Sequence, residues 1–150
     1  MNSLVLAGIV KRVYPNFNMS TFENRLKLQK IVYLLQAYGI NLGYTFTLYH
    51  YGPYCLELMK TAYYVEDFAK IKEVGFEDTG VETKFKAFLE KITPYKNDVN
   101  WLEAASTLHL FKKLYPSESK RELIKRVKTI KSKFGETYLE EVYGGMTEWL

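Results

Sequence analysis

The stretch STFENRLKLQKIVYLLQAYG, residues 20–39, carries the strongest helix pattern in the chain. It starts with a capping box, in which the Ser20 hydroxyl accepts from the N3 amide and Glu23 bonds back to the cap. Apolar residues then recur at helical spacing, and Gly39 stands where a left-handed residue ends many helices. We therefore expect a helix that opens at this box, buries its apolar face and runs to about Tyr38.

A different pattern follows in residues 44–51, which read YTFTLYHY. Aromatic and β-branched residues dominate it, and Gly43 precedes it while Gly52 and Pro53 follow it, so the segment predicts a β-strand. Pro53 is then expected in the first turn of the next helix, where its fixed φ is tolerated. The buried face of that helix is expected to comprise Leu58, Ala62, Val65 and Ala69.

Helical spacing also marks the first and the last parts of the chain. Residues 3–13 read as a short helix with Ser3 as its cap. Towards the C-terminus, Ser119 and Glu122 form a second capping box, which opens a helix with Phe134 on its buried face. The remaining expected helices span about residues 81–92, 98–114 and 136–143, the last followed by a frayed Gly144-Gly145 tail.

Residues 70–80 contain two glycines and predict a turn, with a small hairpin or wing as the alternative. The sequence thus predicts a mainly α fold with six to seven helices and one short strand or small β-hairpin. We expect a single domain spanning residues 1–150. The order helix, strand, helix and wing also leaves a winged-helix-like arrangement open.

Composition narrows the class of protein further. The chain has 150 residues, of which 47% are hydrophobic and 25% charged, which excludes wholesale disorder. A single cysteine excludes an internal disulfide framework. The apolar run at residues 4–10 is short and is followed, not preceded, by Lys11 and Arg12, contrary to the charge order of a signal peptide. We expect a cytoplasmic protein without a membrane partner.

Candidate catalytic residues are few. His50, Cys55 and His109 are the only soft metal ligands, and their spacing matches no zinc motif. Cys55 stands near an expected helix start, where a thiol can be activated, but a small buried cysteine is the favoured interpretation. The chain lacks a Gly-rich phosphate loop as well. The sequence therefore predicts no enzyme, no metal site and no cofactor.

Positive charge is concentrated near the C-terminus, although the net charge is only +4. Residues 112–133 contain nine Lys or Arg and two Glu. Such a face could neutralise nucleic-acid phosphates, or it could be a solvated helix face. The candidate nucleic-acid-binding residues are Lys120, Arg121, Lys125, Arg126, Lys128 and Lys131.

Two stretches together resemble a known family. RLKLQKIVYLLQ at residues 25–36 and YHYGPYC at residues 49–55 are similar to motifs of the SocA-like Panacea antitoxin domain and of the related YwgA-like proteins. The resemblance implies a mainly helical fold and a non-enzymatic role in toxin–antitoxin modules and mobile elements, where the domain neutralises a toxin by binding it or passes it to a protease. Cys55 departs from the family pattern, which has Ser there.

The second stretch also predicts a binding surface on its own. Tyr49, Tyr51 and Tyr54 are expected to cluster around the corner formed by Gly52 and Pro53, and aromatic clusters often anchor a partner. The alternative is that this corner only holds strand to helix. Lys27 and Lys30 are expected on the polar side of the preceding helix, at the rim of the cluster. A toxin-like partner protein is thus the first hypothesis, nucleic acid is the alternative, and the oligomeric state stays open.

Overall fold

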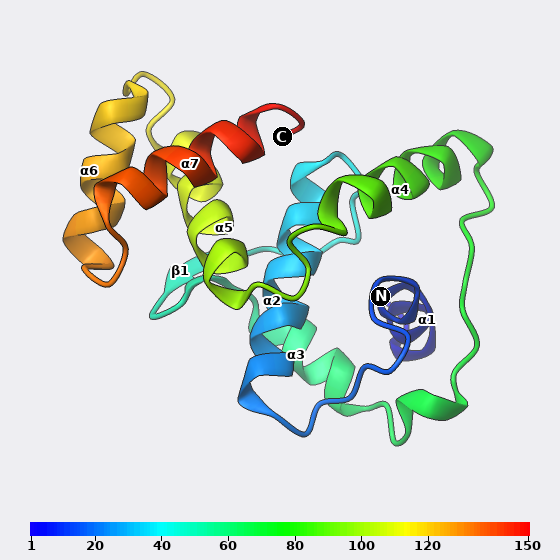
Figure 1. Cartoon of the computed structure of the whole chain (residues 1–150). Coiled ribbons are helices and arrows are strands. Elements are labelled where there is room, and N and C mark those ends of the chain that lie inside the picture. The colour runs from blue at the N-terminus through cyan, green and yellow to red at the C-terminus, as the bar shows by residue number, and fades with distance from the viewer.

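The computed structural model describes all residues from Met1 to Leu150 and confirms the mainly α prediction. Seven α-helices and one small β-hairpin make up the fold, and the hairpin lies at the edge of the helical body beside α5 (Figure 1). In chain order the elements are α1 (Ser3–Val13), α2 (Phe22–Ala37), β1 (Thr47–Tyr49), β2 (Gly52–Tyr54), α3 (Leu56–Tyr63), the short 3-10 helix η1 (Phe68–Lys70), α4 (Thr79–Ile92), α5 (Val99–Leu114), α6 (Lys120–Ile130) and α7 (Glu136–Thr147).

The helices α2 and α5 form the centre of the molecule and pack against each other. Both have long uninterrupted buried runs, residues 28–35 in α2 and residues 101–108 in α5, because neighbours cover them on several sides. At one end α6 and α7 pack on α5, and at the other α1 packs on α3 (Figure 1). A single hydrophobic core of 38 buried residues joins all seven helices.

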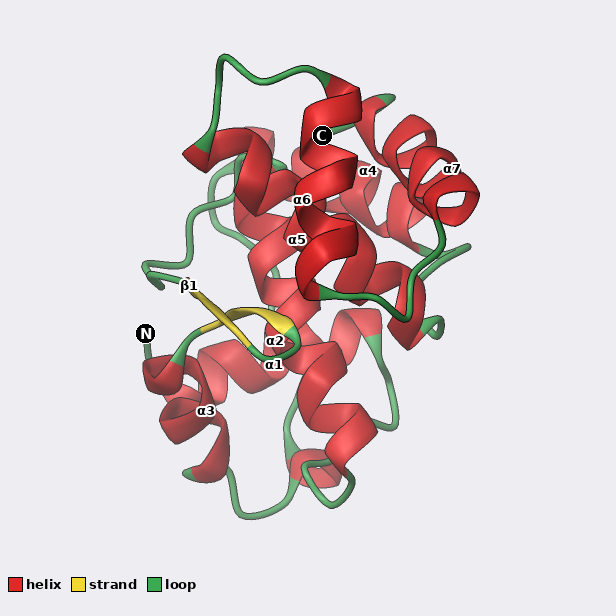
Figure 2. Cartoon of the chain, turned by 90° about the vertical axis from the view of Figure 1, so that its left-hand side faces the viewer, coloured by secondary structure: helices red, strands yellow, loops and turns green.

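The β-hairpin replaces the predicted strand over residues 44–51. Its strands are antiparallel, with Leu48 opposite Pro53, and β2 packs on α2 and α5 (Figure 2). The prediction that Pro53 begins a helix is wrong, because it lies within β2. Alternate pairs of an antiparallel ladder exchange no hydrogen bonds, so a residue without N–H is tolerated in such a short strand. The following helix starts only at Leu56, with Cys55 as its N-cap.

Two predicted helix caps are displaced by one residue. Asn2, not Ser3, caps α1, and Thr21, not Ser20, caps α2, each accepting a first-turn backbone N–H. The Ser20 hydroxyl donates to Asn18 instead. Several oxygen-bearing side chains stand in a row at both helix starts, so the sequence pattern cannot select which one adopts the extended backbone of a cap.

The predicted helix through Ala69 is interrupted. α3 ends at Tyr63, and Phe68 of η1 is buried where Ala69 was expected. No hairpin or wing forms beyond it: residues 71–78 run extended without a strand partner. The helix α1 holds the chain where η1 ends, since the side chain of Lys11 donates to three carbonyls of residues 68–71. The winged-helix-like arrangement is therefore wrong.

The C-terminal helices follow the predicted pattern with two changes. The Ser119–Glu122 capping box is present, but α6 ends at Ile130, before Phe134. The helix α7 continues through the two glycines that were expected to fray, because Met146 is buried in the core. None of the helices combines the length and apolarity that crossing a bilayer requires.

Candidate functional site

The two recognisable stretches of the sequence bind each other directly. Gln29 of α2 is 1% exposed, and its side-chain amide pairs with both the N–H and the C=O of Cys55. The side-chain Nε2 donates to the Cys55 carbonyl at 2.9 Å, and Oε1 accepts from the Cys55 N–H at 2.8 Å. A buried backbone N–H and C=O must be paired, so this amide fixes where the hairpin joins α3. The pair of motifs is one structural unit.

A second glutamine holds the other end of the same segment. Gln36 lies two helical turns after Gln29 and therefore on the same face of α2. Its Oε1 accepts from the N–H groups of Leu42 and Tyr44 at 3.1 and 3.0 Å, and its Nε2 donates to the Tyr44 carbonyl at 2.8 Å. The hairpin segment, residues 42–55, is thus bound to α2 at both ends.

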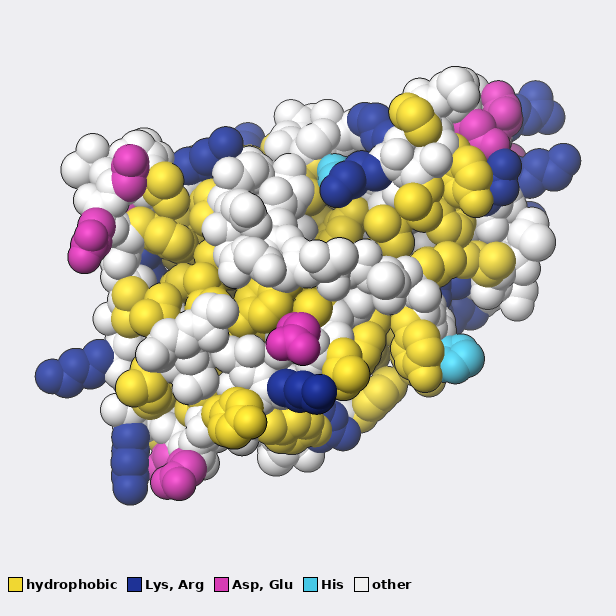
Figure 3. All heavy atoms as spheres, turned by 180° about the vertical axis from the view of Figure 1, so that it is seen from behind, with side chains coloured by type: hydrophobic (Ala, Val, Ile, Leu, Met, Phe, Trp, Pro, Cys, Tyr) yellow, Lys and Arg dark blue, Asp and Glu magenta, His cyan; other side chains and the backbone are white.

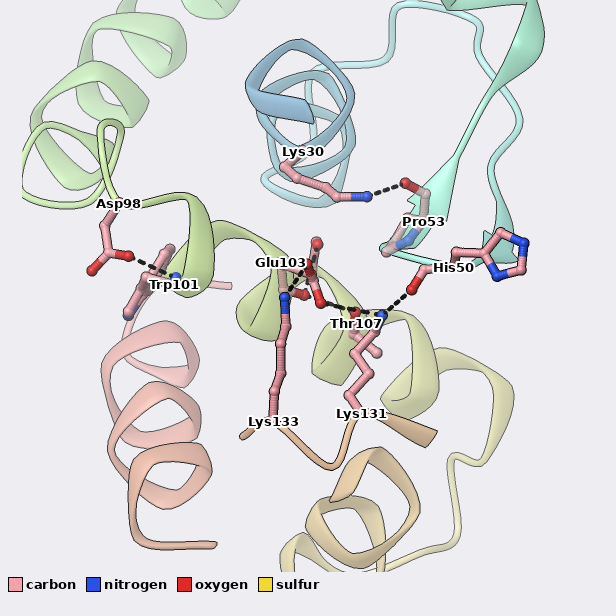
Figure 4. A network of polar contacts seen from close by, with 10 residues as sticks. Lys30, His50, Pro53, Asp98, Trp101, Glu103, Thr107, Lys131 and Lys133 are labelled. Atoms are coloured by element: carbon pink, nitrogen blue, oxygen red, sulfur yellow. Dashed lines mark hydrogen bonds and ion pairs between the residues drawn. The ribbon is translucent and has the colours of Figure 1, made fainter. Parts of the chain in front are cut away.

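Lys30 lies beneath the hairpin and not at the rim of the aromatic cluster, so that prediction is wrong. Its side chain is 1% exposed, and Nζ donates to the Pro53 carbonyl at 2.7 Å (Figure 4). Burial lowers the pKa of Lys30 to about 7, while the Glu103 carboxylate acts in the opposite direction. A lysine is ordinarily a surface residue and is almost never fully buried unless it is paired. Here a carbonyl in the hairpin supplies its partner.

Glu103 of α5 connects the hairpin to the chain after α6. It is 2% exposed, and its two oxygens lie 3.2 Å from Lys131 Nζ and 3.0 Å from Lys133 Nζ (Figure 4). Lys131 Nζ also donates to the His50 carbonyl at 2.7 Å. The side chain of Lys131 is only 4% exposed, so its assignment to a nucleic-acid-binding face is wrong. It is a buried cation that pairs with the only acidic residue in the buried run of α5.

Gly52 allows the hairpin to pack closely on α5. Its φ is +94°, a region that L-residues with a Cβ rarely adopt. A Cβ at this position would lie 2.4 Å from the hydroxyl oxygen of Thr107. Both the backbone conformation and the close approach therefore require glycine here.

We expect Gly52→Ala to lower the free energy of unfolding by about 2–3 kcal/mol, the sum of positive-φ strain and overpacking. Gly43 is the matched control, since its φ is +86° but nothing lies within 4 Å of an added Cβ. Gly43→Ala should cost only the strain, about 1 kcal/mol. Chemical denaturation measures both values. Equal losses of unfolding free energy would show that the contact with Thr107 does not contribute to stability.

The buried ammonium of Lys30 predicts a pH dependence of stability. Because its pKa is about 7 in the folded chain and near 10.4 when unfolded, the folded state binds fewer protons between these values. The free energy of unfolding then rises with pH across this window, by about 1 kcal/mol per pH unit. Below pH 7 the full cost of burying the protonated lysine lowers stability. The variant Lys30→Met should lose this rise between about pH 7 and pH 9. If the free energies of unfolding of wild type and variant, measured by urea denaturation, changed with pH in parallel, the prediction would be contradicted.

An open groove lies between the start of α2, the hairpin and α3, and we call it the hairpin groove. Its volume is about 460 Å³. The three predicted tyrosines, Tyr49, Tyr51 and Tyr54, all line it, together with Gly52. Sequence reasoning missed the lining side chains of the two neighbouring helices. These are Phe22, Arg25, Leu26 and Gln29 from α2, and Leu56, Met59, Lys60 and Tyr63 from α3. The predicted Lys30 borders the groove from its buried floor.

Two predicted residues of this site lie elsewhere. Pro53 is buried in the hairpin and does not line the groove. Lys27 points away from it, with Nζ 3.6 Å from Glu23 and 5.8 Å from the centre of the Tyr14 ring. Lys27 is two residues, about half a helical turn, from the groove residues Arg25 and Gln29, so it falls on the opposite side of α2.

The walls of the hairpin groove are aromatic pairs. The rings of Phe22 and Tyr51 meet edge to face with centroids 5.2 Å apart, and those of Tyr49 and Tyr54 are 5.4 Å apart. Such pairs add stability beyond the area that they bury. They hold large side chains in fixed positions at the surface, ready to receive a ligand without further ordering.

The basic helix α6 is a second candidate surface, smaller than the sequence predicted. Arg126 is bound by Glu118, with Nη2 to Oε1 at 2.6 Å, and its guanidinium lies 3.8 Å from the centre of the Tyr115 ring. The side chains that remain exposed on α6 without an acidic partner are Lys120, Arg121, Lys125 and Lys128. Arg121, Lys125 and Lys128 border one pocket of about 470 Å³, which Glu136 also lines.

The three soft ligands do not converge. Cys55 is buried, whereas His50 lies exposed in the turn of the hairpin. His109 lies far along α5, where its Nδ1 is 2.8 Å from the Tyr33 hydroxyl. Burial lowers the pKa of His109 to about 4, so the ring is neutral at physiological pH. This hydrogen bond gives the half-buried His109 ring a partner within the chain.

Comparison with known proteins finds no relative of this chain. No protein-family model matches the chain, and neither a curated protein nor a solved structure does. The resemblance to the Panacea antitoxin domain therefore rests on residues 25–36 and 49–55. The structure gives a physical reason for the two stretches to occur together, because Gln29 and Lys30 of the first bind the backbone of the second.

Proposed function

We propose that this protein is an antitoxin-like interaction domain that neutralises or regulates a partner protein by binding it in the hairpin groove. The role is non-enzymatic: the domain holds its partner and makes or breaks no covalent bond. The resemblance of residues 25–36 and 49–55 to antitoxin domains supports this function, and the groove supplies the surface that it needs.

One observation carries the proposal. The chain has twelve large hydrophobic side chains that are exposed, and five of them line this single groove. They are Phe22, Tyr49, Tyr51, Leu56 and Tyr63. Scattered exposed hydrophobic residues are normal, but a contiguous group marks a site of interaction. Tyrosine, the commonest of them here, is also enriched among the residues that dominate binding energy at interfaces.

A photo-crosslinking experiment in the source cell tests the groove. The photoreactive analogue benzoylphenylalanine is placed at Tyr63, which lines the groove and is 59% exposed, or at its neighbour Tyr64, which is 79% exposed and does not. A partner that crosslinks from Tyr63 and not from Tyr64 supports the proposal. Equal crosslinking from both positions, or none from Tyr63, would contradict it.

The captured partner then allows a quantitative test. We expect Tyr54→Ala to weaken its binding at least about thirtyfold, as for an interface hot spot, while Tyr64→Ala changes it less than about threefold. For an antitoxin, the partner alone should arrest growth, co-expression of the wild-type chain should restore it, and Tyr54→Ala should not. Equal affinities of wild type and Tyr54→Ala would exclude the groove, and a harmless partner would exclude the antitoxin role.

Nucleic-acid binding through α6 is the second candidate function, and the exposed basic side chains of that helix support it. Titration against duplex DNA at 50 and 200 mM salt distinguishes it from the first. Neutralisation of three or four phosphates would give an affinity that falls steeply with salt and that Lys125→Glu and Lys128→Glu reduce. No binding at low salt would eliminate this candidate.

A further inference from the structure

We infer that the hairpin groove selects an acidic peptide segment, one in which hydrophobic side chains alternate with Asp or Glu. This inference rests on the proposed function, because it specifies the chemistry of the partner that the groove takes. Its basis is the charge of the groove lining and the extent of the hydrophobic surface around it.

The charged residues of the groove lining all have one sign. Arg25 and Lys60 present their charges to it, and no Asp or Glu lines it. Lys30 also borders the groove, but it is buried and donates to the Pro53 carbonyl, so it is not available to a ligand. The chain as a whole has 21 basic and 17 acidic residues, so an all-basic lining exceeds its general charge balance. Charge complementarity favours a partner that brings carboxylates.

Two of these cations flank the aromatic walls from opposite helices. Arg25 of α2 makes one hydrogen bond within the chain, from Nη1 to the Met19 carbonyl at 2.9 Å, which orients the guanidinium and leaves its other N–H groups for a ligand. Lys60 of α3 is exposed and forms no ion pair. A segment lying along the groove would meet a cation on either side.

The acidic side chains around the groove form no ion pair with Arg25 or Lys60, and the buried Glu103 pairs with Lys131 and Lys133. Glu23 of α2 pairs with Lys27 on the far side of that helix. Glu57 is exposed on α3 but does not line the groove. Figure 3 shows one face of the molecule, on which hydrophobic side chains are exposed in groups with both basic and acidic side chains at their edges.

The hydrophobic surface extends past the groove, which favours a polypeptide segment over a small molecule. Leu48 of β1 is 40% exposed and stands next in sequence to the lining residue Tyr49. A partner that covers Leu48 as well as the groove must be elongated. Hydrophobic anchors at alternate positions can fill the groove while the residues between them face the basic side chains.

A peptide selection tests the inference with a defined probe. A phage-displayed library of random twelve-residue peptides is panned against the full chain and counter-selected against Tyr54→Ala. We expect the enriched peptides to contain aromatic residues or leucine together with two or more Asp or Glu. The affinity of the best peptide, measured by fluorescence anisotropy, should fall as salt is raised from 50 to 500 mM.

A charge reversal with a matched control completes the test. Lys60→Glu should weaken the acidic peptide about tenfold or more. Lys128→Glu, the same change at an exposed position of α6 outside the groove, should leave the affinity unchanged. Enriched peptides that are neutral or basic would overturn the inference while leaving the groove a binding site. Failure to enrich any peptide that depends on Tyr54 would overturn the proposed function with it.

Discussion

Replacing Glu103 by alanine is expected to lower the free energy of unfolding by about 3–5 kcal/mol, the usual cost of breaking a buried ion pair from one side. Glu103 and Lys131 are 2% and 4% exposed, so the variant leaves the Lys131 ammonium buried without its counter-charge. The same change removes the carboxylate that faces Lys30. Urea denaturation followed by circular dichroism measures the loss.

A shorter ion pair at the surface of the molecule provides the control. Glu118 and Arg126 approach to 2.6 Å, closer than Glu103 and Lys131, but the Arg126 side chain is 44% exposed. Exposed pairs contribute little, so Glu118→Ala should cost much less than Glu103→Ala in the same experiment. A loss for Glu103→Ala no larger than that for Glu118→Ala would mean that the buried network does not hold the hairpin in place.

The second large effect is expected for Gln29→Leu. This change preserves volume but leaves the N–H and C=O of Cys55 buried without partners, at about 1–3 kcal/mol for each group. We expect a total loss of about 2–4 kcal/mol in the free energy of unfolding. The join between the hairpin and α3 also loosens, so binding in the hairpin groove should weaken although none of its aromatic residues is changed.

Gln36→Leu is the comparison for this variant. Gln36 makes the same kind of side-chain amide contacts, but its hydrogen bonds are only partly buried because Gln36 itself is half-buried. Its loss should cost about 1 kcal/mol, the net value of ordinary hydrogen bonds. If Gln29→Leu proved no more costly than Gln36→Leu in the same denaturation experiment, the bond between the two motifs would be an incidental contact.

The helices could be predicted from the sequence because their apolar residues recur at helical spacing over ten residues or more. The prediction failed where local signals compete. Thr21 rather than Ser20 caps α2, and the choice depends on which residue adopts the extended backbone. Tertiary burial also overrides local preference, as where Met146 keeps α7 helical past two glycines.

Part of the candidate site could also be predicted from the local sequence. The three tyrosines around Gly52 do line one groove, because the hairpin brings them together over a few residues. Lys30 and Lys131 were expected at the surface and are buried. Their partners, Pro53 and Glu103, come from other elements of the fold, so no local pattern could reveal them.

Hydrogen–deuterium exchange of the full chain, with and without a saturating amount of its peptide or protein partner, locates the binding surface without any substitution. If the hairpin groove holds the partner, slower exchange should be confined to residues 22–30 and 49–63. Protection concentrated on residues 120–130 instead, with these two segments unchanged, would assign binding to the basic helix and contradict the function proposed for this protein.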